Sequence, residues 1–95
     1  MKTFGETIRN LRESKGLLLR QIAAALEVDT AFISKVERNE RMLRKEQVQK
    51  VATMLEVPEN DLLTLWLSDK VSDLIDEEPF AKDALNLSLK KLKQK

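Results

Sequence analysis

The Lys and Arg side chains are the residues of this sequence best suited to binding a charged partner, and they are unevenly distributed along it. Residues 1–45 carry ten Lys/Arg against six Asp/Glu, residues 46–81 carry two against nine, and residues 82–95 carry five against one. Four cations lie close together at the end of the basic part: Arg38, Arg41, Arg44 and Lys45. A basic front beside an acidic middle suits a protein that meets phosphate groups with one face only. The alternative is ordinary solvated surface charge.

The composition lacks the residues on which most kinds of enzyme active site depend. The chain has neither cysteine nor histidine, which removes disulfides, thiolate chemistry, the commonest general base and the commonest metal ligand. No phosphate-binding loop is present, and the acidic run at residues 76–78 is more typical of a solvated helix end than of a catalytic acid pair. We therefore predict no enzyme activity, no metal, no cofactor and no small-molecule ligand.

The N-terminal segment and the overall composition indicate a small helical protein of the cytoplasm. MKTFGETIRNLRES lacks the apolar core of a signal peptide, and no apolar run approaches the length needed to span a membrane. Ninety-five residues suit one small domain. Two glycines and two prolines among many alanine, leucine, glutamate and lysine residues predict an all-α fold.

The stretch from Arg20 to Asn39 reads as two short amphipathic helices joined by a tight turn. Its apolar residues recur at three-to-four spacing on either side of the turn: Ile22, Ala23, Leu26, Ile33 and Val36. Asp29 can cap the second helix, because its carboxylate can accept from the free amides of the first turn. This is the helix-turn-helix unit, whose second helix can enter the major groove of double-stranded DNA. We predict a recognition helix at about residues 30–38.

The remaining helices are predicted from periodicity and end signals. Thr3 and Glu6 form a capping box before the first helix, and Gly16 can close that helix in the left-handed conformation. Pro58 suits the first turn of the fifth helix. The six expected ranges are residues 4–14, 19–26, 30–38, 45–55, 59 to 75 or 76, and 80–93.

Residues 16–41 resemble the Cro/repressor-type helix-turn-helix family, also called the XRE family. The matching residues are Gly16, Leu17, Ile22, Ala23, Leu26, Val28, Ile33, Ser34, Val36, Glu37, Arg38 and Arg41. The likeness extends to the first helix and to V-x-x-V-A-x-x-L-x-V-P-x-x-x-L-L at residues 48–63. It implies a five-helix DNA-binding domain, here residues 1–67, that acts as a dimer on a two-fold-related operator.

The resemblance also implies roles for individual residues. Base contacts would fall to Thr30, Ala31, Ser34 and Lys35, whose chemistry is coherent because lysine can donate to guanine and alanine can meet a thymine methyl. Phosphate contacts are expected from Arg20, Arg38, Arg41, Arg44 and Lys45. Arg12 and Glu37 would pair inside the domain and fix the recognition helix. Each exposed polar residue could instead simply face water.

Four residues depart from the family pattern. Leu18 stands where Ser or Thr usually caps the second helix, and Leu19 replaces a polar residue that often touches phosphate. Glu27 replaces the turn glycine, and Glu40 places a negative charge in a loop that often carries lysine. One copy of the domain is therefore expected to bind DNA modestly and to depend on dimerisation.

Residues 68–95 exceed what the family domain needs and are expected to form a C-terminal helical extension. We predict a homodimer interface from Leu62, Leu65, Trp66, Val71, Leu74, Ile75, Phe80, Leu85, Leu89 and Leu92. The argument is that LLTLWL at residues 62–67 has apolar residues all round the helix, more than one core face should need. In one alternative the last helix folds back over its own domain. In another the C-terminal helices bind a different protein, as in an antitoxin or adaptor. The whole chain also resembles small regulators encoded beside restriction–modification or methyltransferase genes.

Overall fold

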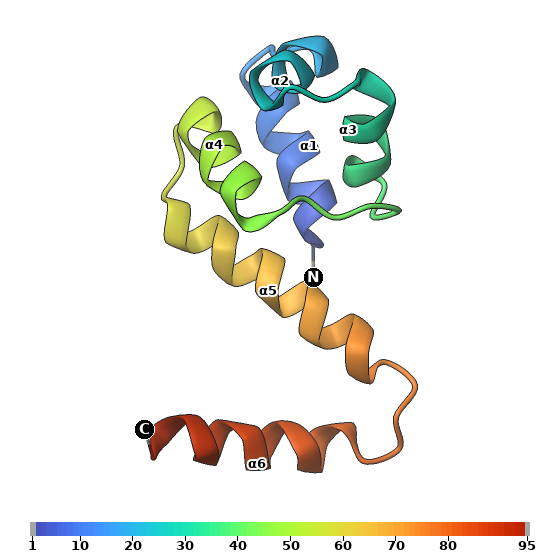
Figure 1. Ribbon diagram of the computed structural model, residues 1–95, viewed down its shortest axis with the longest axis vertical. Helices are drawn as coiled ribbons and strands as arrows, with labels where there is room; N and C mark the ends of the chain where they lie inside the picture. Colours follow the sequence, from blue (N-terminus) through green and yellow to red (C-terminus); the bar gives the residue numbers. More distant parts are fainter. Residues whose placement is uncertain (1, 95) are drawn as a thin grey trace.

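Six helices make up the part of the chain that the computed structural model describes, residues 2–94, and no strand occurs in that range (Figure 1). They are α1 (Phe4–Ser14), α2 (Leu19–Leu26), α3 (Thr30–Glu37), α4 (Lys45–Leu55), α5 (Glu59–Ile75) and α6 (Ala81–Lys93). The all-α prediction is confirmed, with two small differences in helix bounds. Arg38 follows α3 as its C-cap, and Phe80 precedes α6 as its N-cap.

The predicted end signals of α1 and α3 take the expected geometry. Thr3 Oγ1 accepts from the Glu6 amide at 3.2 Å, which is one half of the predicted capping box, and Asp29 Oδ1 accepts from the Phe32 amide at 2.7 Å. Gly16 lies in the left-handed region at φ 69°, where an L side chain would be strained. Local residue types therefore define where these two helices begin and where α1 ends.

Helices α2 and α4 end in the same way. Glu27 after α2 and Glu56 after α4 both lie in the left-handed region, at φ 57° and 56°. The valine that follows each glutamate donates its amide to a carbonyl five residues back, at 3.0 and 3.1 Å. This is the Schellman arrangement, which usually uses glycine at the left-handed position. Glu27 and Glu56 therefore both adopt a conformation that favours glycine.

The two helices also begin alike, without the usual capping side chain. Leu18 and Arg44 hold the N-cap positions, and neither side chain makes a capping hydrogen bond. Instead the Leu18 amide donates to Gln21 Oε1 at 2.7 Å, and the Arg44 amide donates to Gln47 Oε1 at 2.8 Å. The glutamine supplies half of a capping box and compensates partly for the missing Ser or Thr.

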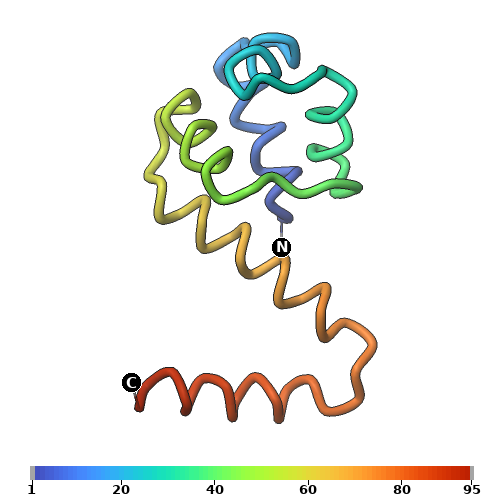
Figure 2. Tube along the Cα trace, viewed as in Figure 1, coloured from blue at the N-terminus to red at the C-terminus, as the bar shows by residue number. Residues whose placement is uncertain are grey.

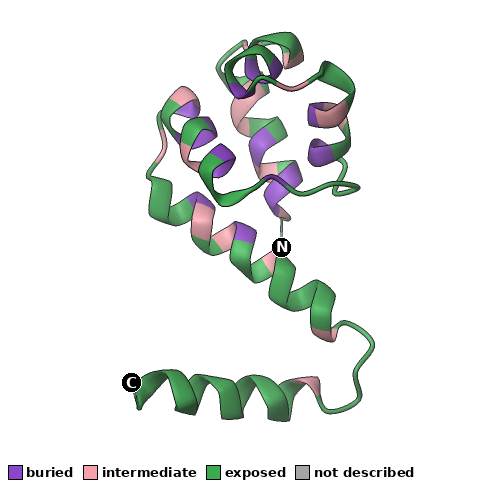
Figure 3. Ribbon diagram, viewed as in Figure 1, coloured by how far each residue is buried: buried purple, intermediate pink, exposed green. Residues whose placement is uncertain are grey.

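The core is formed by α1 to α5, whose inward faces carry the buried side chains (Figure 3). Helix α1 packs on α3 and α5, α2 packs on α3 and α4, and α4 packs on α5. The largest fully buried side chains are Ile8, Ile22, Ile33, Leu55, Val36, Val48 and Val51. The core thus spans the whole five-helix arrangement expected of the family.

The structure corrects two members of the predicted dimer interface. Leu62 and Trp66 are only 3% and 8% exposed and belong to the core of the same chain. Leu65 is half-buried and packs against that core. Most of the apolar surplus at residues 62–67 is thus covered within one copy, because the start of α5 lies on both α4 and α1. The predicted domain boundary at residue 67 falls inside the continuous helix α5.

Helix α6 stands apart from the other helices. The chain turns back after Ile75, and α6 runs back beneath α5, separated from the five-helix domain (Figure 2). None of its residues is buried. It does not complete the core of its own domain, which disfavours the alternative that α6 folds back over α1 to α5.

Candidate nucleic-acid interface

The turn between α2 and α3 sets the direction of α3. The left-handed Glu27 reverses the chain, Val28 is half-buried beneath the turn, and Asp29 caps the new helix. Helix α3 then buries Ile33, Val36 and Glu37 on one side. Its opposite side faces solvent, as expected for a helix that reads a groove.

The four predicted base-reading residues lie on the first two turns of α3. Thr30, Ala31 and Lys35 are exposed, and Ser34 is half-buried. Thr30 is the first residue of the helix, directly after the Asp29 cap. In helix-turn-helix proteins, the N-terminal residues of the second helix approach the base edges.

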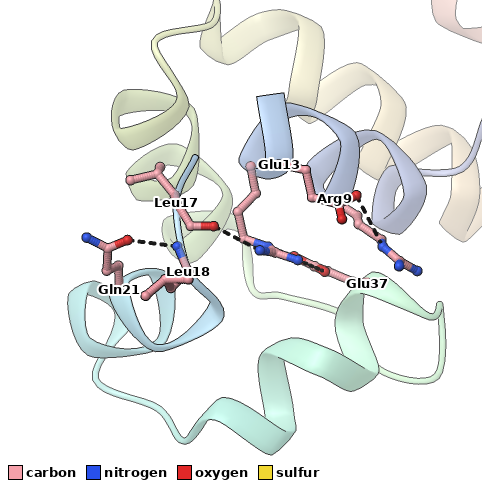
Figure 4. Close-up of polar contacts among 7 residues, drawn as sticks. Arg9, Glu13, Leu17, Leu18, Gln21 and Glu37 are labelled. Atoms are coloured by element: carbon pink, nitrogen blue, oxygen red, sulfur yellow. Dashed lines mark hydrogen bonds and ion pairs between the residues drawn. The ribbon is translucent and has the colours of Figure 1, made fainter. Parts of the chain in front are cut away.

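A buried ion pair holds the far end of α3 against α1 (Figure 4). Arg12 Nε donates to Glu37 Oε2 at 2.7 Å, and Arg12 Nη2 donates to Glu37 Oε1 at 3.1 Å. Arg12 Nη1 also donates to the Leu17 carbonyl oxygen at 2.9 Å, which ties the loop after α1 to the same guanidinium. The hydrogen bond to Glu37 raises the pKa of Arg12 above its already high value, so the guanidinium stays charged. Such a bidentate pair fixes orientation as well as distance.

Close backbone packing reinforces the ion pair. A Cβ atom at Gly5 would collide with the Val36 carbonyl oxygen and would lie 2.6 Å from Asn39 Oδ1. Asn39 Oδ1 in turn accepts from the Gly5 amide at 3.3 Å, and Asn39 has a positive φ of 64°, which asparagine tolerates better than most residues. Sequence reasoning missed the role of Gly5, although a glycine inside a helical pattern is a known sign of close backbone approach.

The predicted phosphate-contacting cations all reach solvent. Arg20 lies in the first turn of α2, and Arg38, Arg41 and Arg44 lie between α3 and α4, where Lys45 begins the next helix. Arg38 forms a surface ion pair with Glu40, Nε to Oε2 2.8 Å. The negative charge noted at Glu40 therefore partly neutralises one of these cations.

Two long-range hydrogen bonds to α5 were not visible in the sequence. Trp66 Nε1 donates to the Leu43 carbonyl oxygen at 2.8 Å, and the Phe4 amide donates to Asp69 Oδ2 at 2.8 Å. They attach α5 to the loop before α4 and to the start of α1. Hydrophobic periodicity carries no signal for either bond, because both partners are fixed only by the tertiary fold.

Neither a metal site nor a membrane-spanning helix is found in the part of the chain that the structure describes. Within residues 2–94 no cluster of three or more Asp and Glu side chains is arranged to hold a metal ion. No helix in that range is long and apolar enough to cross a membrane.

Comparison with known proteins places the chain in the helix-turn-helix family. Residues 8–62 match the helix-turn-helix family. The HTH-type transcriptional repressor RghR of Bacillus subtilis is 36% identical over 64 residues, which are 66% of this chain and 47% of that protein. The chain thus spans about half the length of the curated relatives it matches.

Solved structures agree at the level of the fold. The restriction-modification controller protein C.AhdI of Aeromonas hydrophila is 32% identical with a TM-score of 0.56, covering 62% of this chain and 89% of that one. The clp gene regulator ClgR of Corynebacterium glutamicum is 24% identical with a TM-score of 0.59, covering 94% of this chain and 84% of that one. The second match shows that the similarity of fold extends into the C-terminal region.

Proposed function

This chain belongs to the Cro/repressor-type helix-turn-helix family, and from that premise we propose that it is a transcriptional regulator of the cytoplasm that binds an inverted-repeat DNA operator as a homodimer. The observation that carries the proposal is the outward face of α3. Most of that face is exposed. The helix itself is capped at its start by Asp29 and attached to α1 at its end by the Arg12–Glu37 ion pair. A rigid helix with a free polar face is what groove reading requires.

Base reading is assigned to Thr30, Ala31, Ser34 and Lys35. Lys35 can donate to guanine O6 and N7, the hydroxyls can donate or accept, and the Ala31 methyl can meet a thymine methyl. Phosphate contacts are assigned to the five cations that flank this helix: Arg20, Arg38, Arg41, Arg44 and Lys45. Because Arg38 is paired with Glu40, we expect it to contribute less than Arg41 or Arg44.

The homodimer is assigned to the exposed apolar face of the extension. This face comprises Leu67, Val71, Leu74, Ile75, Phe80, Leu85, Leu87, Leu89 and Leu92; most of them are exposed large hydrophobics, up to 79% for Leu74 and 72% for Phe80, and Ile75 is half-buried. An open groove of about 420 Å³ lies along α5 and is lined mainly by α5 residues, among them Val71 and Ile75, with Leu85 as its one lining residue from α6. An apolar surface of this kind in a small protein marks an interaction site.

Charge complementarity argues that the partner is a second copy of this chain. Residues 46–81 carry two cations against nine acids, whereas residues 82–95 carry five against one. Lys90, Lys91 and Lys93 lie at the end of α6, and the acidic run at residues 76–78 lies at the turn before it. If two copies pair with their α6 helices antiparallel, the basic end of each meets the acidic turn of the other.

The operator is tested by selecting bound sites from random double-stranded DNA. We expect an inverted repeat whose half-sites are separated by about one helical turn or a multiple of it, since each copy presents one recognition helix. Lys35→Ala and Thr30→Ala should lose discrimination between operator and random DNA while the unfolding curve is preserved. Selection of a single non-repeated site would contradict the dimeric mode, and unchanged discrimination in both variants would contradict the base-reading assignment.

The phosphate assignment has a separate test with a matched control. Arg41→Ala and Arg44→Ala should weaken binding to all DNA sequences alike and lower the salt dependence of the binding constant by about one per lost contact. Lys82→Ala removes an equal charge from α6 and should leave both quantities unchanged. Equal effects of the three substitutions would mean that only net charge matters.

The dimer is tested by sedimentation of Leu89→Asp beside Asn86→Asp. Both substitutions add a carboxylate to an exposed position of α6, but only Leu89 belongs to the apolar face. We expect a dimer for the parent protein and for Asn86→Asp, and a monomer for Leu89→Asp. A parent protein that is monomeric would instead favour the second candidate, in which this face binds a different protein as an adaptor does.

A further inference from the structure

Trp66 connects α5 to the loop that carries the flanking arginines. Its side chain is 8% exposed, and its Nε1 atom donates to the Leu43 carbonyl oxygen at 2.8 Å in a buried hydrogen bond. Leu43 itself is buried, whereas Arg41, Met42 and Arg44 around it are exposed. The bond therefore holds the backbone at the one residue of this segment that points into the core.

The loop between α3 and α4, residues 38–44, is otherwise held at its two ends. At its start, Asn39 accepts from the Gly5 amide at 3.3 Å, and the Asn39 and Glu40 amides donate to carbonyls of α3 at 3.0 and 2.9 Å. At its end, the Arg44 amide donates to Gln47 Oε1 at 2.8 Å. Between these two points the hydrogen bond from Trp66 connects the loop to α5. It therefore helps to fix the position of the backbone at Arg41 and Arg44.

The Trp66 ring also contacts a cation, since the Lys70 ammonium lies 3.9 Å from the centre of the indole. The next turn of α5 is attached to α1, because Asp69 accepts from the Phe4 amide at 2.8 Å. One residue further along α5, Leu67 is exposed and belongs to the apolar face assigned to the dimer. The same helix thus contacts the arginine-bearing loop with one side and offers the dimer surface with another.

We propose that Trp66 is a positioning residue for DNA binding: through its hydrogen bond to the Leu43 carbonyl it holds Arg41 and Arg44 in register with the phosphate backbone, and it joins that loop to the dimerising helix. This inference rests on the proposed phosphate contacts of the two arginines. A side-chain donor satisfying a buried carbonyl is costly to remove, because the carbonyl then has no partner. The loop would be expected to relieve that cost by moving.

The sharpest test uses the fact that Trp66 is the only tryptophan of the chain. Replacing it with 3-benzothienylalanine keeps the size and shape of the ring but puts sulfur in place of the N–H group. We expect affinity for the operator to fall about tenfold because the two arginines are no longer held in place, with a smaller salt dependence. The lost buried hydrogen bond should shift the unfolding curve modestly. Trp66→Phe should show the same loss of affinity together with some loss of stability.

A double-mutant cycle separates positioning from a general effect on the fold. In a background carrying Arg41→Ala and Arg44→Ala, the benzothienyl replacement should have almost no further effect on affinity, since the loop has no arginines left to position. Leu62→Val, one turn earlier on the buried side of α5, is the matched control and should lower stability without changing the salt dependence.

Two results would overturn the inference, and they are distinguishable. If the arginine double variant weakens binding but the benzothienyl replacement weakens it equally with and without the arginines, Trp66 acts only through overall stability. If the arginine double variant retains the affinity and salt dependence of the parent, the proposed phosphate contacts fail and the role of Trp66 falls with them.

Discussion

The five-helix domain and the extension that follows it carry the same kinds of apolar residue in opposite surroundings. In residues 2–94, ten large hydrophobic side chains are exposed, and eight of them lie at residue 67 or later. Helix α6 is as clearly amphipathic as α4, yet α4 buries five residues and α6 none. The difference lies in what each helix packs against. A lone helix of this length is marginal in water, so α6 needs a partner that α4 already has.

The largest expected effect concerns the interior of the domain. Glu37→Ala would leave Arg12, whose side chain is only 12% exposed, without its partner and should lower the free energy of unfolding by about 3–5 kcal/mol. Urea denaturation measures this change. Arg12→Met combined with Glu37→Met should recover most of the loss, because an apolar pair removes the uncompensated charge.

The matched control for that prediction is the exposed pair of Arg38 and Glu40. Its side chains are both 55% exposed, so Glu40→Ala should leave the unfolding midpoint nearly unchanged. If Glu37→Ala were equally mild, the Arg12–Glu37 pair would not be what fixes the end of α3.

The next prediction compares the loss of one leucine side chain from the five-helix domain with the loss of one from the extension. Leu55→Ala removes a side chain with no solvent exposure and should cost about 2–5 kcal/mol of unfolding free energy at any protein concentration. Leu89→Ala should barely change the stability of a dilute sample but should raise the dimer dissociation constant about tenfold or more. Denaturation at two widely separated concentrations distinguishes the two behaviours. Similar, concentration-independent losses would mean that α6 is covered within one chain.

A substitution at Gly5 tests how closely α1 packs on α3, and its expected effect on stability is intermediate. Gly5→Ala would bring a methyl group against the Val36 carbonyl oxygen and should cost about 1–3 kcal/mol, measured by thermal unfolding. Gly16→Ala meets no atom within 4 Å and tests the positive φ alone, at a cost of about 1 kcal/mol. A larger loss at Gly16 than at Gly5 would show that the two helices can separate slightly at little cost.

The smallest expected effect is stabilising. Glu27→Gly should raise the free energy of unfolding by about 0.5 kcal/mol, because glycine adopts the left-handed conformation without strain. Glu56→Gly should gain less, since Glu56 also forms an ion pair with Lys15, Nζ to Oε2 3.3 Å. Calorimetry of both variants would test the order, and a loss of stability at Glu27 would indicate an unrecognised role for its carboxylate.

Much of the domain could be predicted from sequence because its signals are local. Spacing located the helices, Thr3 and Asp29 marked two of their starts, and Gly16 marked a backbone position with positive φ. The Arg12–Glu37 contact came from the family resemblance rather than from spacing, since the two residues are far apart in the chain.

What could not be predicted depends on long-range packing. The pattern LLTLWL shows that several faces of the helix are apolar, but it does not show that Leu62 and Trp66 are covered within the same chain. The hydrogen bonds of Trp66 and Asp69 join residues 23 and 65 positions apart. No local pattern encodes such distances. The roles of Thr30, Lys35 and the arginines remain predictions until DNA binding is measured.

The bond between the Phe4 amide and Asp69 has a consequence for how the protein is made. A ribosome releases α1 first, but the acceptor that completes its first turn lies 65 residues later, near the end of the domain. The nascent chain therefore holds α1 to α4 without their closing contact until most of α5 has emerged from the exit tunnel. The domain should become protease-resistant late and in one step, and a chain stopped at residue 67 would lack Asp69 altogether.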